Sequence, residues 1–474
     1  MTAPKRDIYL LSPKEYSPET IAVAFAKTSR APESFREIAA GLTDEKSAQF
    51  HEKWVVGYGH ASVAEHAVLH LAIENASRLA MESIESNRLA SYTEKSTRYQ
   101  KWDANAFHIP TELDGHPLRD EYIATCRGLF ETYAAALEPV KAVVQQAVPQ
   151  REGEKDEAWD RRIRSQYVDV CRFLLPASAL ANVGMTANGR VLENAIRKWR
   201  SSPLAEVREI GETIKNVAQA EIPTLVKYAE PVPYLVESGE ALAEIVHPKA
   251  FVEKRKSKDW CTLIDYDKEG EQRILAAALY RYGNMSYSEA LSAVRNSPQQ
   301  REPIADALLS RLGRHDTPLR ELEYTSYTFD IIMDQGAYAE FKRHRMMSQS
   351  PQLLSGALGY AVPKRMALAG LEGEYCKAMD AAVTLWEKLA AWNPQVAQYI
   401  APNGFNRRVL ATFNLREAFA FCQLRAAPNA HFSIRKVAER VYEEIQNVHP
   451  LLTKYMPMPQ DSWQDVDEQY FVKL

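Results

Sequence analysis

The sequence is poor in the residues that build metal centres and disulfide frameworks. It has 474 residues and only five cysteines, which are scattered singly, without a Cys-x-x-Cys pair. This usage suits a reducing compartment and argues against a disulfide-stapled or zinc-bound fold. No metal-ligand spacing, no glycine-rich phosphate loop and no Ser/His/Asp set occurs. We therefore expect no metal site.

Membrane and secretion signals are also missing. No apolar run is long enough to span a bilayer, and the N-terminal residues contain no signal-type apolar core. The net charge is only -4, from 58 Lys and Arg against 62 Asp and Glu. Such a balance gives no global attraction to nucleic acid or to an anionic membrane. We predict a cytoplasmic protein that binds neither, so any anion site must be a local cluster.

What the sequence does contain is an internal repeat. Residues 21–24 resemble 274–277, residues 59–63 resemble 314–318, and residues 223–228 resemble 450–455. The separation between the copies falls by about 30 residues along the chain, which predicts an insertion in the first copy. We place it in the charged, periodless run at 150–164 and interpret that run as a surface loop. The length of the chain agrees with two domains.

Each copy has the same order of elements. An early helix (21–28; 274–281) precedes a turn with a histidine, His60 or His315, and then a strand of alternating apolarity (68–73; 322–332). A short helix follows, and the rest of each half is predicted to be helical, including residues 124–136, 190–199, 375–391 and 430–446. We predict a helix-rich α/β or α+β fold with one sheet per repeat, the repeats spanning 1–232 and 255–474 around a linker at 233–254.

The most basic motif lies at residues 343–348, Arg-His-Arg-Met-Met-Ser. Two guanidiniums and an imidazole at the end of a short helix suit a phosphate or an anionic ring edge. The alternative is a solvated basic face, which short basic runs commonly form.

The first copy carries an incomplete version of this motif. Arg88-x-x-Ser91 aligns with Arg345-x-x-Ser348, but the preceding Arg-His pair is absent. The first copy continues instead as Glu-x-Ser-x-Arg-Tyr at residues 94–99, where the second has Pro-Gln-Leu-Leu-Ser-Gly at 351–356. Each copy therefore holds what the other lacks.

Joined together, the two copies give Arg-His-Arg-x-x-Ser-x-x-Glu-x-Ser-x-Arg-Tyr, which resembles the signature of flavin-dependent thymidylate synthases. Chains of that family are roughly half as long, so the resemblance covers nearly the whole sequence twice. It implies reductive methylation of deoxyuridylate (dUMP) to thymidylate. Methylenetetrahydrofolate would supply the carbon, reduced FAD the hydride, and NADPH would reduce the flavin.

The resemblance also implies a nucleotide-binding set in the first copy. A Ser hydroxyl and an Arg fork two residues apart can face one phosphate, although the Arg could instead pair with a nearby Glu. Residues 171–176 resemble a family element whose Arg meets the nucleotide. The implied substrate-binding residues are Glu94, Ser96, Arg98, Tyr99 and Arg172.

The implied flavin contacts lie mainly in the second copy. Cationic groups near the flavin would stabilise its reduced, anionic form. The turn at 60–66 resembles a flavin-contacting turn of the family better than its counterpart at 315–320 does. In this alignment Arg320 stands at the position of Glu65. A solvated basic patch and satisfied turn histidines remain the alternatives. The implied cofactor-binding residues are Arg343, His344, Arg345, Asn414, Arg416, His60 and Ser62.

Arg425 keeps the family spacing after Asn414-x-Arg416, and the resemblance implies that it contacts the pyrimidine, where an Arg would polarise the ring carbonyls. The first copy offers Arg200, but one extra residue separates it from Arg190, and that rotates a helical side chain by about 100°. The catalytic candidates are therefore Arg425 and Arg200.

The family works as a homotetramer with shared sites, so a tandem chain is expected to form a homodimer that builds a pseudo-tetramer. Each site would join residues 343–345 and Arg425 of the second copy to the 94–98 loop of the first. Two other functions stay open, because a fold does not fix a function. One is a flavin enzyme that acts on another pyrimidine nucleotide or carries out different carbon chemistry. The other is a non-catalytic nucleotide-binding or assembly protein.

Overall fold

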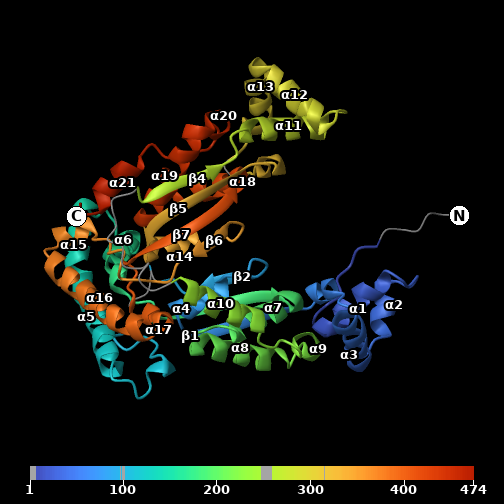
Figure 1. Cartoon of the computed structure of the whole chain (residues 1–474), viewed down its shortest axis with the longest axis horizontal. Helices are drawn as coiled ribbons and strands as arrows, with labels where there is room; N and C mark the ends of the chain where they lie inside the picture. Colours follow the sequence, from blue (N-terminus) through green and yellow to red (C-terminus); the bar gives the residue numbers. More distant parts are fainter. Residues whose placement is uncertain (1–6, 97, 99–101, 247–258, 314, 474) are drawn as a thin grey trace. The chain divides into compact units, whose positions relative to one another are not determined.

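The structure is a computed structural model that describes all residues except 1–6, 97, 99–101, 247–258, 314 and 474. The chain forms two compact units (Figure 1). Unit 1 comprises Met1–Lys95, Pro110–Asp114 and Leu180–Ala250, and unit 2 comprises Ser96–Ile109, Gly115–Ala179 and Phe251–Leu474. The units do not coincide with the two sequence repeats, because a helical segment of the first repeat, 115–179, belongs to unit 2.

Unit 1 is built on an antiparallel sheet in the order β1-β3-β2. Its strands are β1 (Val68–Ser77), β2 (Ser91–Glu94) and β3 (Leu180–Asn188). Alternate residues of the central strand β3 are buried, as expected for a sheet covered by helices on one face. The helical elements of this unit are α1 (Pro18–Thr28), α2 (Phe35–Ala40), α3 (Asp44–His51), η1 (Glu52–Gly57), η2 (Ala61–His66), α4 (Arg78–Glu85), η3 (Thr111–Leu113), α7 (Gly189–Arg200), α8 (Ala205–Ala218), α9 (Pro223–Val226) and α10 (Pro233–Ile245).

Unit 2 repeats this plan with one more strand. Its antiparallel sheet has the order β4-β5-β7-β6, from β4 (Cys261–Tyr266), β5 (Ser326–Asp334), β6 (Ser348–Pro351) and β7 (Asn406–Asn414). The second repeat contributes the helical elements α11 (Gly270–Tyr282), α12 (Tyr287–Asn296), α13 (Pro298–Leu309), η6 (Arg320–Glu323), α14 (Gln335–Phe341), α15 (Lys364–Leu368), α16 (Glu372–Trp392), α17 (Pro394–Ala397), η7 (Gln398–Ile400), α18 (Leu415–Arg425), α19 (Phe432–Val448), α20 (Pro450–Thr453) and α21 (Trp463–Tyr470).

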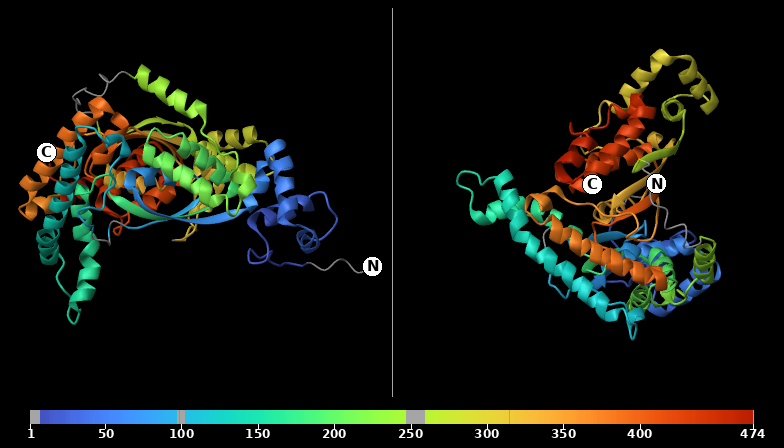
Figure 2. Two further views of the ribbon diagram at one scale, coloured as in Figure 1. Left: turned by 90° about the horizontal axis from the view of Figure 1, so that it is seen from below. Right: turned by 60° about the vertical axis from the view of Figure 1, so that its left-hand side comes forward.

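The first repeat adds α5 (Arg119–Ala147), α6 (Asp156–Cys171) and η4 (Arg172–Leu174) to unit 2. Helix α5 runs beside α16, its counterpart in the second repeat (Figure 2). It does so because α5 buries one stripe of side chains at helical spacing. That stripe includes Tyr122, Cys126, Leu129, Tyr133, Leu137, Val140 and Val144.

Matching segments of the two repeats meet at residues 173–178 and 399–404. The backbone N–H of Asn403 donates to the carbonyl of Leu175 at 3.0 Å, and that of Ala177 donates to the carbonyl of Ala401 at 2.9 Å. Gly404 allows this close approach, because a Cβ there would lie only 3.2 Å from Phe173 Cδ1 of the first repeat. Pairing of equivalent segments is the arrangement found where identical subunits meet across a two-fold axis.

The predicted helix-rich fold with one sheet per repeat is confirmed. The first predicted strand lies within β1, but only the end of 322–332 is a strand, because residues 320–323 form a 3₁₀ turn. The prediction that the rest of each half is helical was wrong at β3 and β7, the central strands. Strand β3 contains alanine, glycine and asparagine, which strands disfavour, so only its period-2 burial marks it.

The predicted surface loop at 150–164 was also wrong in its second half, because α6 begins at Asp156. Arg164 contacts Asp160 at 2.5 Å one turn along the helix, and Asp160 also accepts from Lys141 of α5 at 2.9 Å. Ion pairs at this spacing support a helix that has little apolar periodicity. Most of the predicted linker, residues 233–245, is helix α10, and the remainder from 247 lies outside the described residues.

No helix of the described residues combines the length and the apolar character needed to cross a membrane. No group of three or more His, Cys, Asp or Glu side chains in the same residues is placed to hold a metal ion.

Helix α19 contains a buried carboxyl group without a hydrogen-bond donor. Glu439 is 4% exposed, and neither of its oxygens accepts a hydrogen bond from the described residues. Burial raises the pKa of Glu439 to about 7, although Arg435 opposes the shift, while Asp461 and Asp465 add to it. The folded protein therefore holds this proton more tightly than the unfolded chain does. The contribution of Glu439 to stability is fully present below the unfolded pKa and is lost as the pH rises through 7.

We expect Glu439→Gln to remove this pH dependence. At pH 8 the variant should be more stable than the parent by up to about 3 kcal/mol, and the difference should close toward pH 4. Urea unfolding at both pH values measures it, with Glu468→Gln on the exposed face of α21 as the control. Equal stability of parent and variant at pH 8 would contradict the assignment.

Candidate active site

The basic motif of the second repeat follows β5 and α14. Asp334 ends the strand and caps the helix, its Oδ1 accepting from the N–H of Ala337 at 2.8 Å. The helix stops at Phe341, so residues 343–345 leave it as a turn. Of these, Arg343 is exposed, Arg345 is half-buried and His344 is buried. The three residues therefore have different surroundings despite being neighbours in sequence.

His344 connects a carboxylate to a guanidinium. Arg425 Nε donates to His344 Nε2 at 3.0 Å, which leaves the proton on Nδ1, and Nδ1 lies 2.9 Å from Glu417 Oε1. Burial lowers the pKa of His344. A neutral imidazole in this tautomer donates to Glu417 and accepts from Arg425, so it fixes the orientation of Arg425.

Arg425 has a second carboxylate partner. Its Nη1 donates to Glu340 Oε2 at 2.9 Å, and Glu340 Oε1 lies 3.8 Å from Arg172 Nη2. Glu340 and Arg172 are 8% and 6% exposed. Glu340 therefore bridges an arginine of the second repeat and an arginine of the first.

Asp169 connects two arginines of the first repeat, Arg98 and Arg172. It accepts from Arg98 Nη2 at 2.7 Å and from Arg98 Nε at 3.0 Å, and Arg172 Nε lies 3.5 Å away. Asp169 is 3% exposed, and burial raises its pKa while the two arginines oppose the rise. Behind it, His431 is fully buried, lies 3.3 Å from the Asp169 carbonyl, and has a pKa far below its usual value because of burial.

These contacts link arginines and carboxylates in one continuous chain, with the neutral His344 between Arg425 and Glu417. We call this chain the arginine network. All of its members lie in unit 2. Each guanidinium has five N–H donors, so an arginine held by one carboxylate retains donors for an anionic ligand. The members, in order of contact, are Arg98, Asp169, Arg172, Glu340, Arg425, His344 and Glu417.

Sequence reasoning identified the basic members of this network and missed the acidic ones. Asp169, near the end of α6, lies three residues before Arg172, the first residue of η4. That spacing puts both side chains on one face of a helix, and it was the available signal. For Glu340 and Glu417 no signal was available, because an acidic residue on a helix is usually solvated and burial cannot be read from the sequence.

The predicted nucleotide loop divides between the two units. Glu94 belongs to β2 of unit 1 and forms a buried ion pair with Arg78 at 2.9 Å. Ser96 Oγ accepts from the N–H of Arg98 at 3.2 Å, a local turn within unit 2. Tyr99 lies outside the described residues.

Asn414 and Arg416 take structural positions at the start of α18. The Asn414 side chain caps the helix by accepting from the N–H of Glu417 at 2.9 Å. Arg416 pairs with Glu323 at 2.7 Å and donates to the Pro318 carbonyl at 2.9 Å. These bonds place Arg416 against the turn that precedes β5.

The first repeat contains the same ion pair. Arg190 contacts Glu65 at 2.5 Å, and Glu65 precedes β1 by as many residues as Glu323 precedes β5. The strand registers agree, since Val68 pairs with Asn188 as Ser326 pairs with Asn414. The structural counterpart of Glu65 is therefore Glu323, which corrects the sequence alignment that faced it with Arg320.

Arg200 is surrounded differently from Arg425. Its Nε contacts Glu212 at 2.7 Å, and its Nη1 contacts Glu230 at 2.9 Å and the Ala229 carbonyl at 2.6 Å. These bonds tie α7 to α8 and to the segment after α9 in unit 1. Arg200 therefore has the contacts of a structural residue.

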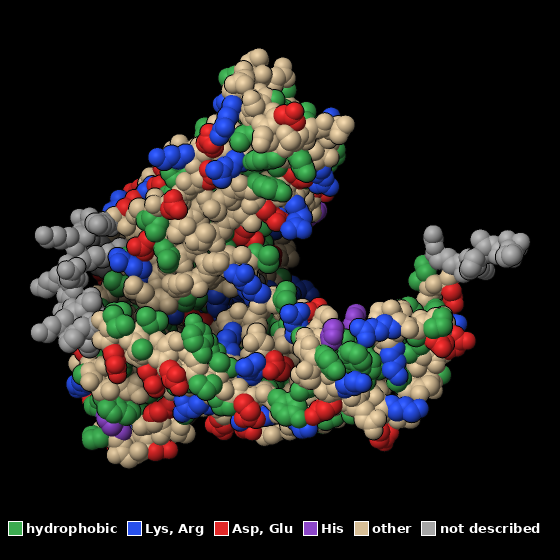
Figure 3. Space-filling model, turned by 45° about the vertical axis from the view of Figure 1, so that its right-hand side comes forward, with side chains coloured by type: hydrophobic (Ala, Val, Ile, Leu, Met, Phe, Trp, Pro, Cys, Tyr) green, Lys and Arg blue, Asp and Glu red, His purple; other side chains and the backbone are tan. Residues whose placement is uncertain are grey.

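His60 and Ser62 line a pocket of about 500 Å³ in unit 1, between the C-terminal part of α1 and the turn η2. The Arg30 guanidinium lies 4.9 Å above the Trp54 ring, and the His60 ring lies 5.9 Å from it. Lysine, arginine and histidine side chains gather beside hydrophobic ones at this end of the unit (Figure 3). The structure therefore places the predicted cofactor residues in two sets, this pocket in unit 1 and residues 343–345, 414 and 416 in unit 2.

A family model described as thymidylate synthase complementing protein matches residues 11–224 and again residues 262–451. The chain belongs to this family. It matches the model twice, so the sequence repeat is a tandem duplication of the family domain. The two matched segments meet each other at the 173–178 and 399–404 junction of unit 2.

Relatives of two sizes agree with the duplication. A UPF0159 protein of Chlamydia muridarum is 31% identical over 431 residues, covering 87% of this chain and 81% of its own. A UPF0159 protein of Thermoplasma acidophilum is 28% identical, covering 86% and 88%. A flavin-dependent thymidylate synthase of Clostridium tetani is 26% identical over 220 residues, covering 45% of this chain and 83% of its own.

A solved structure, the flavin-dependent thymidylate synthase of Helicobacter pylori complexed with FAD and dUMP, aligns with 42% of this chain and 99% of its own. The identity is 17% and the TM-score is 0.31.

Proposed function

We propose that this protein is a flavin-dependent thymidylate synthase that methylates dUMP reductively, with methylenetetrahydrofolate as carbon donor, FAD as cofactor and NADPH as reductant of the flavin. The observation that carries the proposal is the arginine network. The two repeats hold complementary halves of the family signature, and the network joins Arg98 and Arg172 of one half to His344 and Arg425 of the other.

In this proposal the two ends of the network have different roles. Arg98, beside Ser96, binds the phosphate, since the planar fork of a guanidinium suits phosphate oxygens. Arg425 faces the pyrimidine and polarises its carbonyls, which favours attack where no enzyme nucleophile assists. The neutral His344 ring holds Arg425 in place by accepting from Arg425 and donating to Glu417.

The residues suggested for FAD fit a phosphorylated aromatic cofactor. Arg343 is exposed beside the network, and the unit 1 pocket combines Arg30 with the indole of Trp54. Arginine suits pyrophosphate, and an aromatic ring suits a base or flavin face. When bound, FAD would supply the hydride. The protein would orient it and balance the charge of its reduced form.

One observation is equally compatible with a second candidate, a different pyrimidine nucleotide. Arg425 and Glu340 together offer a donor and an acceptor at the proposed base end. This pair fits the carbonyl and N3–H of uracil, and it equally fits the N3 and the amino group of cytosine. Competition between dUMP and dCMP for the purified protein separates the two.

The first test is the visible absorbance spectrum of the purified protein, reconstituted with FAD, before and after addition of dUMP. We expect a flavin band that shifts with dUMP, because both ligands would occupy one site. Arg343→Ala should lose the flavin, whereas Arg98→Ala should keep it and weaken dUMP binding by about tenfold or more.

Each outcome of these tests supports a different candidate function. Thymidylate formation with methylenetetrahydrofolate and NADPH supports the enzyme. A flavin band indifferent to dUMP but shifted by dCMP would transfer the proposal to the second candidate. No flavin after reconstitution would leave a non-catalytic nucleotide-binding protein.

By the same resemblance we propose that the chain forms a homodimer in which four repeats reproduce a tetramer. The pairing of equivalent segments at 173–178 and 399–404 supports this, because the duplication would then hold two former subunits in one chain. The mass in solution tests it.

A further inference from the structure

Each unit has a pocket at the same place in its repeat. The unit 1 pocket, of about 500 Å³, lies between the end of α1 and η2, and the unit 2 pocket, of about 670 Å³, lies between the end of α11 and η6. Because Glu65 corresponds to Glu323, His66 of the first pocket corresponds to Tyr324 of the second. The two pockets can therefore be compared residue by residue.

The helices that form the other wall can be matched as well. Glu19 near the start of α1 accepts from the N–H groups of Thr224 and Leu225 at 2.9 and 3.2 Å. Glu271 of α11 accepts from the N–H of Leu452 at 3.0 Å, at the equivalent turn of the second repeat. This match shifts the sequence alignment of 21–24 with 274–277 by one residue.

The unit 1 pocket is basic and aromatic. It is lined by Lys27, Arg30, His60 and His66, with Trp54 beneath the Arg30 guanidinium, and its lining contains no acidic residue. Among the described residues, no carboxylate pairs with Lys27 or Arg30. Unpaired cations beside an aromatic ring suit a ligand that carries phosphates next to a flat ring system.

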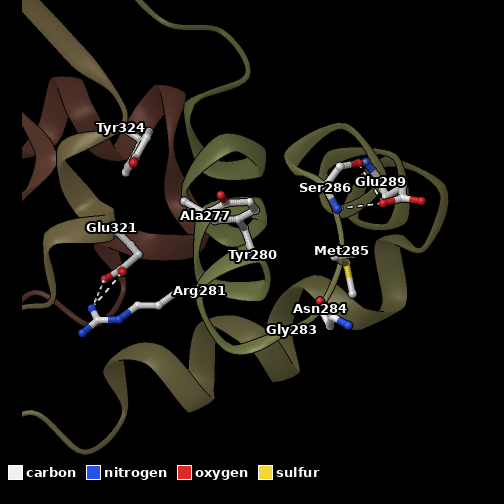
Figure 4. Close-up of a pocket in the computed structure, with 10 residues that line it drawn as sticks. All are labelled: Ala277, Tyr280, Arg281, Gly283, Asn284, Met285, Ser286, Glu289, Glu321 and Tyr324. Atoms are coloured by element: carbon white, nitrogen blue, oxygen red, sulfur yellow. Dashed lines mark hydrogen bonds and ion pairs between the residues drawn. The ribbon is translucent and has the colours of Figure 1, made fainter.

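The unit 2 pocket has lost these cations. The residues that correspond to Lys27, Arg30 and His66 are Leu279, Tyr282 and Tyr324. In addition, Glu321 enters the lining and accepts from Arg281 Nη1 at 2.8 and 3.1 Å (Figure 4).

A second carboxylate lies in the same pocket. Glu289 accepts from the N–H of Ser286 at 2.7 Å at the start of α12 (Figure 4). The Arg281 charge is already balanced by Glu321, so Glu289 leaves the lining with an excess of negative charge. Phosphate groups would be repelled there.

We propose that the chain binds one phosphorylated dinucleotide cofactor and not two, that Lys27 and Arg30 hold its phosphates in the unit 1 pocket, and that the unit 2 pocket has lost this role. The inference rests on the proposed function for the choice of FAD as the cofactor. The duplication has thus kept two copies of the pocket and only one copy of its phosphate-binding chemistry.

Isothermal titration of the full-length, flavin-free protein with FAD, and separately with ADP, tests the proposal. We expect one FAD per chain. Arg30→Ala should weaken the binding of both ligands by about tenfold or more, because a charge-assisted hydrogen bond to phosphate is lost. Arg281→Ala, which removes the arginine that lines the unit 2 pocket, should leave both affinities unchanged.

Two FAD molecules per chain would overturn the inference, as would affinity that depends on Arg281 and not on Arg30. Failure to bind FAD and ADP would overturn it as well. Failure to bind FAD would also overturn the proposed function. The other two outcomes leave that function standing, because it is judged by dUMP binding and thymidylate formation. One Arg30-dependent FAD without thymidylate formation would sink the function and leave the inference standing.

Discussion

We expect Arg425→Ala to lower kcat/KM for thymidylate formation by two to three orders of magnitude, or about 3–4 kcal/mol of transition-state stabilisation. Arg425 is the member of the arginine network proposed to polarise the pyrimidine. Its loss also leaves Glu340 and His344 without their shared donor. Arg425→Lys should recover little activity, because an ammonium cannot contact both partners in the plane of a guanidinium.

Steady-state kinetics with dUMP as the varied substrate measures this effect. The control is Leu424→Ala, the exposed neighbour on α18, which should change kcat/KM by less than about twofold. Arg200→Ala gives a further contrast, since the loss of its bonds to Glu212 and Glu230 should lower stability and leave the nucleotide affinity intact. Full activity in Arg425→Ala would show that the arginine network takes no part in catalysis.

The second large effect concerns Asp169. We expect Asp169→Asn to lower the apparent Tm by roughly 6 °C or more, because breaking a buried ion pair costs about 3–5 kcal/mol. The side chain of Asp169 is 5% exposed and balances Arg98 and Arg172 together. An amide of the same shape would leave two guanidiniums without their shared counter-charge.

Asp160→Asn on the same helix is the matched control. Asp160 also contacts two cations, Lys141 and Arg164, but its side chain is 19% exposed, so water replaces part of what is lost. Its expected cost is about 1 kcal/mol or less. Calorimetry of both variants makes the comparison, and equal Tm values for the two would contradict the structural role of Asp169.

The sequence predicted the parts of this molecule that depend on local pattern. Helices such as 375–391 and 430–446 follow from apolar spacing, and the basic residues of the proposed site follow from a motif. The division of the chain into units could not be predicted, because α5 and α6 leave their own repeat through contacts with α16 that are distant in sequence. The acidic members of the network could not be predicted for the same reason. Glu340 differs from a solvated glutamate only in the residues that folding brings into contact with it.

The crossing of α5 and α6 into unit 2 has a consequence for the newly made chain. Arg98, Asp169 and Arg172 leave the ribosome long before Glu340 and Arg425 are synthesised. At typical translation speeds the interval between Arg172 and Arg425 is roughly 10–50 s. During that time the hairpin of α5 and α6 has made its own contacts, but its partner helix α16 does not yet exist. A nascent chain stopped before residue 372 therefore leaves uncovered the side of α5 that packs against α16 in the folded protein.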